Sequence, residues 1–190
     1  MYVDSYRKDG TFMTDYFVNK QCDEALQGLA TGNMDSLVTI YNKLGRRIYM
    51  LAFSILRDKE AAEDIMQDTF IKIATEARTY KKNSNAIAFI LTVTRNLSLN
   101  LLAKRRHDAK NQSSLEDLGD VVDSSDHLTS ACVATIPELS LLDDDERQIV
   151  VMKLDAGMKH RDIAALLSIS EDACQKRYRR ALEKLKKHYR

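Results

Sequence analysis

Apolar side chains recur along this chain at spacings of three and four residues, which is the period of an amphipathic α-helix. This pattern predicts three long helices, over residues 37–55, 60–80 and 86–104. A shorter helix is expected over residues 21–32, ending near Gly28 or Gly32. No segment alternates convincingly at the period of two that a half-buried β-strand would show. The sequence therefore predicts an all-α fold.

The last fifty residues repeat the helical period in three shorter units. Three consecutive aspartates, at residues 143–145, offer N-cap and first-turn carboxylates for a helix through Leu154. A short amphipathic helix and a tight polar turn follow over residues 161–170, and Ser170 opens a helix that continues through Lys187. Two helices joined in this order form a helix-turn-helix, whose second helix lies in the major groove of DNA.

Two positions depart from the usual helix-turn-helix pattern. Ser168 stands in the turn where glycine is common, and serine takes the required left-handed geometry only with some strain. Lys159 stands where a serine or threonine N-cap usually begins the first helix of the pair. These changes weaken the local signal, but they do not remove it.

Charge divides the chain into two basic parts and an acidic connection. The net charge of +1 conceals +4 over residues 1–106, −9 over residues 107–145 and +6 over residues 146–190. Basic parts suit the phosphate backbone of DNA, whereas the acidic, polar segment is typical of a flexible linker. We therefore expect two small helical domains, residues 21–106 and the helix-turn-helix domain of residues 136–190, joined by a linker of residues 107–135. Residues 1–20 would form an N-terminal extension that is either disordered or packed on the first domain.

Composition and motifs exclude several classes of protein. Three dispersed cysteines fit a reducing cytoplasm, and no Cys or His pair has the spacing of zinc ligands, so no metal and no cofactor are expected. The chain shows no secretion signal, and its longest apolar runs are too short to cross a bilayer, so we expect a cytoplasmic protein without membrane insertion. It has no Gly-rich phosphate loop and no nucleophile–base pair in a recognisable context, so an enzyme is not expected.

The final helix has one apolar side and one basic side. Cys174, Tyr178, Ala181 and Leu185 share a stripe that we expect to face the core. The other side carries one amide and three cations, Gln175, Lys176, Arg179 and Arg180. Two more cations, Arg177 and Lys184, flank it. Glutamine and arginine can pair with adenine and guanine edges, while lysine and arginine can neutralise phosphates. The alternative is a solvated basic face on a helix that only packs.

Two further motifs lie in the N-terminal part. The first is AAEDIMQDTF at residues 61–70, in which Asp64, Gln67 and Asp68 fall on one helix face. The second is AFILTVTRN at residues 88–96. Asn100 follows one helical turn after Asn96, the last residue of this motif. Three consecutive cations at residues 104–106 come next and suit binding to phosphates.

With these motifs the chain resembles a bacterial RNA polymerase sigma factor of the extracytoplasmic-function group. The first motif is similar to the family's region-two pattern D-A-E-D-apolar-apolar-Q-[DE]-x-F. The second is similar to A-W-L-x-x-[IV]-A-R-N, with Phe89 in place of tryptophan. The helix-turn-helix resembles the family's region four, so the resemblance covers residues 22–106 and 136–188 in the expected order. It implies a subunit that binds core polymerase, recognises promoter DNA and promotes strand opening for transcription initiation of a stress or envelope regulon.

The resemblance also implies partners and site residues. The clamp coiled coil of the polymerase's largest subunit would bind Asp64, Gln67, Asp68 and Phe70, and the flap would be a further contact. A loop and the helix after it would handle the downstream promoter element and its melting, through Tyr80, Lys81, Asn83, Asn85, Phe89, Arg95, Asn96, Asn100 and Arg105. The upstream promoter element would be contacted by Gln175, Lys176, Arg177, Arg179, Arg180 and Lys184. An anti-sigma factor is expected as a further partner.

A stand-alone DNA-binding regulator with the same helix-turn-helix is the main alternative. It leaves the acidic motif at residues 61–70 and the helix that carries Arg95 and Asn96 without a role. At single positions, simpler interpretations also remain open. The acidic motif could be an ordinary solvated helix face, and Phe89 could serve core packing instead of base stacking.

Overall fold

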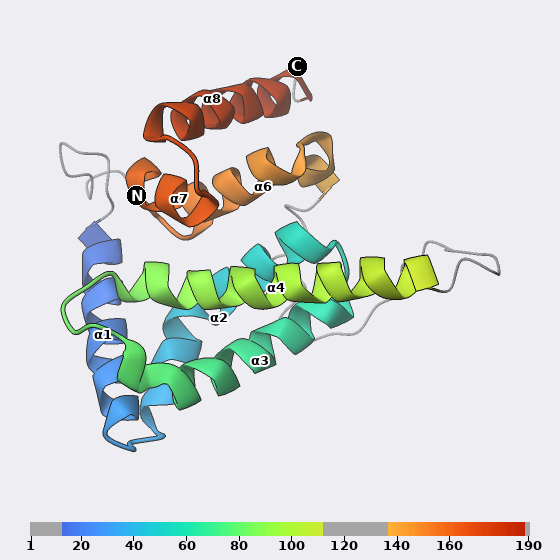
Figure 1. Cartoon of the computed structure of the whole chain (residues 1–190). Helices are drawn as coiled ribbons and strands as arrows, with labels where there is room; N and C mark the ends of the chain where they lie inside the picture. The colour runs from blue at the N-terminus through green and yellow to red at the C-terminus, as the bar shows by residue number, and fades with distance from the viewer. Residues whose placement is uncertain (1–12, 112–136, 189–190) are drawn as a thin grey trace.

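The computed structural model describes residues 13–111 and 137–188, and every regular element within these two ranges is a helix (Figure 1). The first range, here the first module, contains α1 (Met13–Ala30), α2 (Ser36–Leu56), α3 (Lys59–Glu76), the 3₁₀ turn η1 (Ala77–Thr79) and α4 (Ala86–Asn111). The second range, here the second module, contains the 3₁₀ turn η2 (Pro137–Leu141), α6 (Asp144–Val150), the π-helical turn η3 (Val151–Asp155), α7 (His160–Leu167) and α8 (Glu171–His188). The predicted all-α fold is confirmed.

The first module is a four-helix cluster whose core comes from the predicted apolar stripes. Its largest fully buried side chains belong to all four helices: Leu26, Ile40, Leu44, Ile48, Leu51, Ile73, Ile90 and Leu91. All four helices contact one another, and α2 packs most extensively on the other three, so it is the central element of the module. Each such aliphatic side chain contributes about 1.5–3 kcal/mol when it is removed from water.

The second module confirms the helix-turn-helix. α7 and α8 pack on each other and on α6 or η3, around Ile149, Met152, Ile163, Cys174 and Ala181. Ser168 ends α7 in the left-handed conformation, with φ 56° and ψ 40°, as its position in the turn predicts. Lys159 is the N-cap of α7 and makes no side-chain capping bond.

Side-chain caps explain where several helices begin. Asp58 precedes α3 and accepts a hydrogen bond from the backbone N–H of Ala61 at 3.1 Å. Asp143 precedes α6 and forms a capping box, in which its carboxylate accepts from the N–H of Glu146 at 2.8 Å while the Glu146 carboxylate accepts from the N–H of Asp143. Ser170 precedes α8 and accepts from the N–H of Ala173 at 3.2 Å. Each cap satisfies a backbone donor that the first helical turn leaves unpaired.

Three helix boundaries differ from the sequence prediction. α1 begins at Met13 instead of near residue 21. Its added part has little apolar periodicity, but Val18 packs against the core and Asn19 accepts a hydrogen bond from the N–H of Ile87 in α4. α4 continues to Asn111, into the segment predicted as linker, because its last residues are mainly good helix formers. The helix predicted through Leu154 changes to a π-helical turn after Val150. The remaining parts of the predicted extension and linker lie outside the described residues.

α4 also corrects the expectation that no segment is long and apolar enough to cross a membrane. Its residues Ala86–Asp108 reach a mean hydropathy of 1.5 and satisfy that test by length and composition. However, the core helix of a soluble protein satisfies the same test, and α4 packs against α1, α2 and α3. It also buries the hydroxyls of Thr94 and Ser98, which donate to backbone carbonyls one turn earlier.

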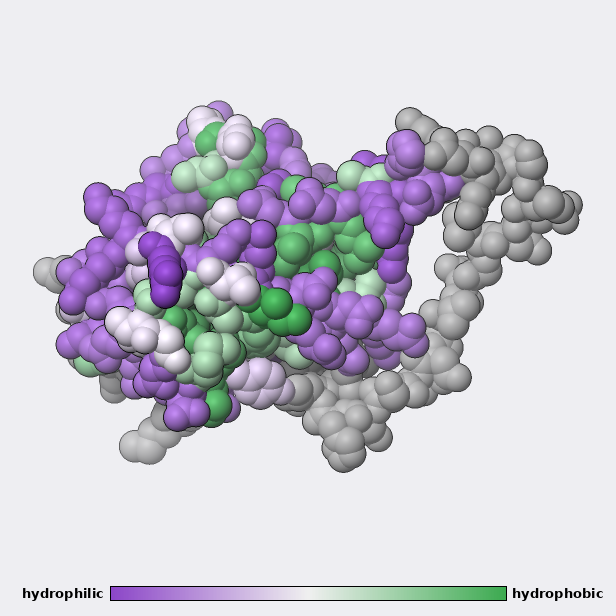
Figure 2. Space-filling model, turned by 60° about the horizontal axis from the view of Figure 1, so that its bottom comes forward, coloured by the Kyte–Doolittle hydropathy of each residue, from purple (hydrophilic) through white to green (hydrophobic). Residues whose placement is uncertain are grey.

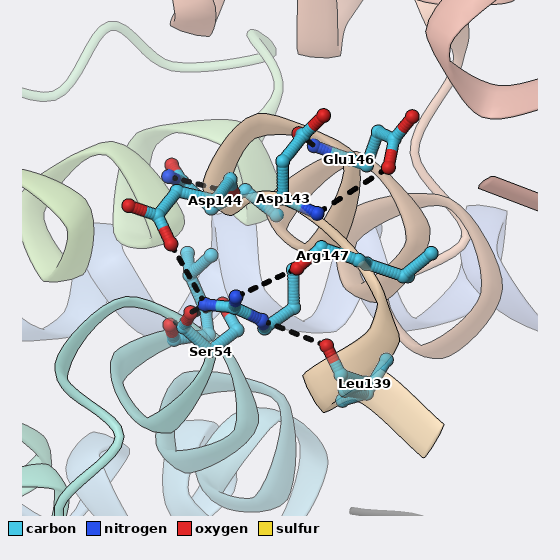
Figure 3. Close-up of polar contacts among 9 residues, drawn as sticks. Ser54, Leu139, Asp143, Asp144, Glu146 and Arg147 are labelled. Atoms are coloured by element: carbon cyan, nitrogen blue, oxygen red, sulfur yellow. Dashed lines mark hydrogen bonds and ion pairs between the residues drawn. The ribbon is translucent and has the colours of Figure 1, made fainter. Parts of the chain in front are cut away.

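The two modules touch each other, with α2 and α4 on one side and α6, η3 and α7 on the other (Figure 1). Arg147 of α6 is 3% exposed, and its guanidinium donates to the backbone carbonyl of Ser54 in α2 at 2.8 Å (Figure 3). Arg46 of α2 forms an ion pair with Asp155 of η3 at 3.2 Å. The contact between the modules is therefore built in part from buried polar groups.

Candidate nucleic-acid interface and docking face

One face of α3 presents the acidic motif to solvent. Asp64, Gln67 and Asp68 are all exposed and lie within about one turn of each other, as their spacing predicts. Their carboxylate and amide oxygens are the acceptors that lysine and arginine side chains of a partner need. We call Asp64, Gln67 and Asp68, together with the exposed Ile71, the docking face.

Apolar surface extends from Ile71 of the docking face onto α2, and the sequence pattern did not reveal it. Ile71 is 63% exposed, and the half-buried Phe70 places its ring 5.6 Å from the ring of Tyr41 in α2. Helical spacing from Leu37 and Leu44 predicts Tyr41 to be in the apolar stripe of α2, but its side chain is 42% exposed, so this position is not in the core. Val38 beside it is 60% exposed. Figure 2 shows apolar surface of this kind gathered among polar side chains on one face of the molecule. Contiguous exposed apolar surface is typical of sites of protein contact.

The segment between η1 and α4 is a short exposed loop rich in amides and cations. Lys81, Lys82, Asn83, Ser84 and Asn85 are all exposed. Asn83 adopts the left-handed conformation, with φ 61°, which an asparagine tolerates better than most residues. The loop, residues 80–85, therefore offers polar edges and positive charge on one protruding surface.

Tyr80 is the first residue of this loop and Phe89 lies in the first turn of α4, and both are half-buried. Their ring centroids lie 5.2 Å apart, so each ring packs on the other. The Tyr80 hydroxyl donates to the carboxylate of Asp23 in α1 at 2.5 Å. Burial and this hydrogen bond raise the pKa of Tyr80 to about 12, so the hydroxyl keeps its proton and remains a donor. Asn85 caps α4, since its side-chain oxygen accepts from the N–H of Ala88 at 3.0 Å.

α4 carries the remaining predicted downstream residues, in different environments. Asn96 and Asn100 are exposed one turn apart on the helix surface. Arg105 is also on the surface, where it pairs with Asp58 at 3.0 Å. Arg95 is half-buried, and its Nε donates to the side-chain oxygen of Gln148 in α6 at 3.0 Å.

α8 divides its predicted upstream residues into two groups. Arg177 donates to the carboxylate of Asp145, and Lys184 donates to that of Glu146 at 2.5 Å, so both tie α8 to α6. Gln175, Lys176, Arg179 and Arg180 are exposed on the other side of the helix. Cys174 and Ala181 are buried, and Tyr178 and Leu185 are half-buried, which confirms the predicted apolar stripe. The exposed group therefore forms a basic helix face of the kind that enters a major groove.

Two predicted downstream residues also contact the second module. Arg95 donates to Gln148, as described above, and the side-chain amide of Asn85 donates to the carboxylate of Asp162 in α7 at 3.2 Å. Burial lowers the pKa of the Arg95 guanidinium, and the nearby Asp145 opposes that shift. In this arrangement, side chains of the second module therefore form hydrogen bonds with Asn85 in the loop and with Arg95 in α4.

Sequence reasoning missed Asp23, which organises the loop from α1. A carboxylate that is 6% exposed is uncommon in a protein core. The one available signal was its position directly beside the apolar residues Cys22 and Leu26, on the side of α1 that faces the other helices. Its partners lie about sixty residues away in the sequence, so spacing alone could not identify them.

Comparison with known proteins identifies both modules. Residues 40–108 match the family model of sigma-70 region 2, and residues 138–185 match that of sigma-70 region 4. The chain is 26% identical over 163 residues to the RNA polymerase sigma factor CarQ of Myxococcus xanthus, covering 82% of this chain and 90% of that protein. It is 20% identical over 163 residues to the extracytoplasmic-function sigma factor SigX of Bacillus subtilis, covering 78% and 81%.

Solved structures show the same fold. The structure of CnrH in complex with the cytosolic domain of CnrY is similar with a TM-score of 0.63 and 21% identity, covering 89% of this chain and 97% of that chain. The structure of RpoE in complex with the anti-sigma factor NepR from Bartonella quintana gives a TM-score of 0.65 and 20% identity, covering 77% and 92%. Together with the two family models in chain order, these relatives show that the chain belongs to the extracytoplasmic-function group of RNA polymerase sigma factors, which act in transcription initiation.

Proposed function

We propose that this sigma factor binds core polymerase through the docking face on α3, with the clamp coiled coil of the largest subunit as the partner surface. The observation that carries the proposal is the exposed group Asp64, Gln67 and Asp68 beside the exposed Ile71. Acceptors there would pair with basic side chains, while Ile71 and the Phe70–Tyr41 pair would supply apolar contact. The second module would make a further contact with the flap.

The experiment is a binding titration of core polymerase with the full chain. Asp64→Ala combined with Gln67→Ala should weaken core binding and leave the unfolding midpoint unchanged, because both side chains are exposed. The matched control is Gln21→Ala combined with Glu24→Ala, an exposed pair on α1 with the same spacing and the same change in charge. Equal core affinity of the two double variants would refute the assigned docking face.

The promoter would be contacted at two places. In the first module, the loop and α4 would take the downstream element and its melted strand, through the polar loop side chains and through Asn96 and Asn100. Taking a base out of the stack costs a few kcal/mol, which polar and aromatic contacts must offset. In the second module, the exposed face of α8 would take the upstream element, with base edges and phosphates contacted by Gln175, Lys176, Arg179 and Arg180.

The solved relatives support an anti-sigma factor as a third partner. CnrH was solved with the cytosolic domain of CnrY, and RpoE with the anti-sigma factor NepR. The proposed setting is a cytoplasmic initiation factor for a stress or envelope regulon. Transcript profiling after overproduction of the protein tests the regulon, which should contain genes of envelope or stress functions.

A further inference from the structure

The loop between η1 and α4 is held by hydrogen bonds from α1. Asp23 is 6% exposed, and one of its carboxylate oxygens accepts from the Tyr80 hydroxyl at 2.5 Å and from the backbone N–H of Asn83 at 2.7 Å. Its other oxygen accepts from the side-chain amide of Gln27 at 2.5 Å. Both oxygens of this buried carboxylate are therefore paired, and two of the three donors belong to the loop.

Asn19 lies one turn before Asp23 on the same side of α1 and holds the end of the loop. Its side-chain oxygen accepts from the backbone N–H of Ile87 in the first turn of α4 at 3.1 Å. Its amide donates to the backbone carbonyl of Ser84 at 3.4 Å. Asn19 and Asp23 together thus contact both ends of the loop.

These contacts hold the loop from the side of α1 and do not involve the side chains of Lys81, Lys82 and Asn83. Asp23 binds the backbone of Asn83, whose left-handed conformation is less favourable for any residue with a side chain than for glycine. The side chains of Lys81, Lys82 and Asn83 remain exposed. A loop fixed in this way loses less conformational entropy when it binds a ligand.

The fold alone does not require a carboxylate at this position. α1 already packs through Cys22, Ala25, Leu26 and Leu29, all of which are buried. Removing a carboxylate from water is unfavourable unless hydrogen bonds replace the lost hydration. The buried charge of Asp23 therefore has a specific use, and the donors that surround it indicate that this use is the geometry of the loop.

We propose that Asp23, assisted by Asn19, is a positioning residue that presets the loop of residues 80–85 for capture of an unstacked promoter base. This inference rests on the proposed function of the loop in the downstream promoter element. Asp23 itself would not touch DNA. It would act through Tyr80 and the backbone of Asn83, which it holds in place before the DNA arrives.

The test compares Asp23→Ala, Asp23→Asn and Tyr80→Phe in the full chain, bound to core polymerase. Promoter opening is followed by the fluorescence of 2-aminopurine at each position of the downstream element. We expect Asp23→Ala to slow opening about tenfold and to flatten the preference among the four bases at one position. Asp23→Asn keeps an acceptor oxygen and should retain most of the opening rate and of the base preference. Glu24 is an exposed carboxylate in the same turn, so Glu24→Ala should change neither the rate nor the preference.

A second readout does not involve DNA. The backbone amide of Asn83 should exchange its hydrogen faster in Asp23→Ala than in the wild type, because the acceptor is lost. Tyr80→Phe should slow opening less than Asp23→Ala does, and the two changes together should be less than additive because they share one contact. If Asp23→Ala does not fold, the conservative variants Asp23→Asn and Tyr80→Phe still decide the question.

The outcomes separate this inference from the proposed function. If Asn83→Ala and Lys81→Ala leave opening and base preference unchanged, the loop does not contact the promoter and the proposed function of the loop fails. If those two variants impair opening while Asp23→Ala and Tyr80→Phe open the promoter at the wild-type rate and with the wild-type base preference, the positioning role of Asp23 is overturned and the loop's function stands.

Discussion

Arg147 provides the most quantitative prediction about the fold. Its guanidinium is buried and donates to three backbone carbonyls: Leu139 at 3.0 Å, Leu142 at 2.9 Å and Ser54 at 2.8 Å (Figure 3). The Ser54 carbonyl lies in the last turn of α2, where carbonyls lack the usual helical partner, so Arg147 caps a helix of the other module. A cation at this helix end is also favourable for the helix dipole.

We expect Arg147→Met to lower the free energy of unfolding by about 3 kcal/mol. A charged donor contributes about 1.5–3 kcal/mol per hydrogen bond, and three carbonyls lose their donor. Part of that loss is offset because the variant no longer has to bury a charge, whose desolvation is reflected in the lowered pKa of Arg147. The ion pair with Asp144 adds little, since the Asp144 side chain is 77% exposed.

Urea unfolding of the full chain, followed by far-UV circular dichroism, measures the change. Arg105→Ala is the matched control, because it removes an arginine from an exposed ion pair and should cost less than about 1 kcal/mol. Arg147→Lys should fall between the two, since one ammonium cannot serve three carbonyls in different directions. If Arg147→Met is no more destabilising than the control, the buried guanidinium does not hold α2, η2 and α6 together and the reasoning is refuted.

Two further predictions concern the helix that carries the docking face and the DNA-contacting helix. Burial alone would raise the pKa of Asp58, but hydrogen bonds from the Ala61 N–H and from Arg105 outweigh it and lower the pKa. Its stabilising effect is therefore complete above the unfolded pKa of about 4 and is lost as pH falls through the lower folded value. Asp58→Ala should thus cost about 1 kcal/mol at pH 7. The urea midpoints of variant and wild type should converge as pH falls below the lowered folded pKa of Asp58, and a difference that stays constant with pH would contradict the cap. Arg180→Ala should weaken binding of the holoenzyme to its upstream promoter element by about 1–3 kcal/mol, measured by gel-shift titration. Lys187 is also exposed, and Lys187→Ala should not weaken binding by this amount. An equal loss for the two variants would indicate that Arg180 contributes only non-specific charge attraction to DNA and contacts no base.

Much of the fold could be predicted because apolar periodicity and caps are local signals. The stripes of α2, α3 and α4 and the turn at Ser168 depend on residues close together in sequence. The exposure of Tyr41 could not be predicted in this way, because it depends on how much of the ring α3 covers. The start of α1 was missed for a similar reason, since tertiary contacts extend a helix beyond its apolar pattern.

The candidate sites show the same division. The shared face of Asp64, Gln67 and Asp68 follows directly from helical spacing, and so does the exposed face of α8. The hydrogen bond from Tyr80 to Asp23 and that from Arg95 to Gln148 join segments more than fifty residues apart. Only the packing of helices brings such partners together, so periodicity and motifs gave no indication of them.

The central claim, that this chain directs polymerase to promoters, is tested most directly by reconstituted transcription. Purified protein is added to bacterial core polymerase with genomic DNA fragments, and run-off transcripts are mapped. The account predicts binding to core polymerase and new transcripts that start at defined promoters, both lost when Asp64 and Gln67 are replaced together. Specific binding to duplex DNA by the protein alone, without core binding and without initiation, would contradict it and would support a stand-alone regulator.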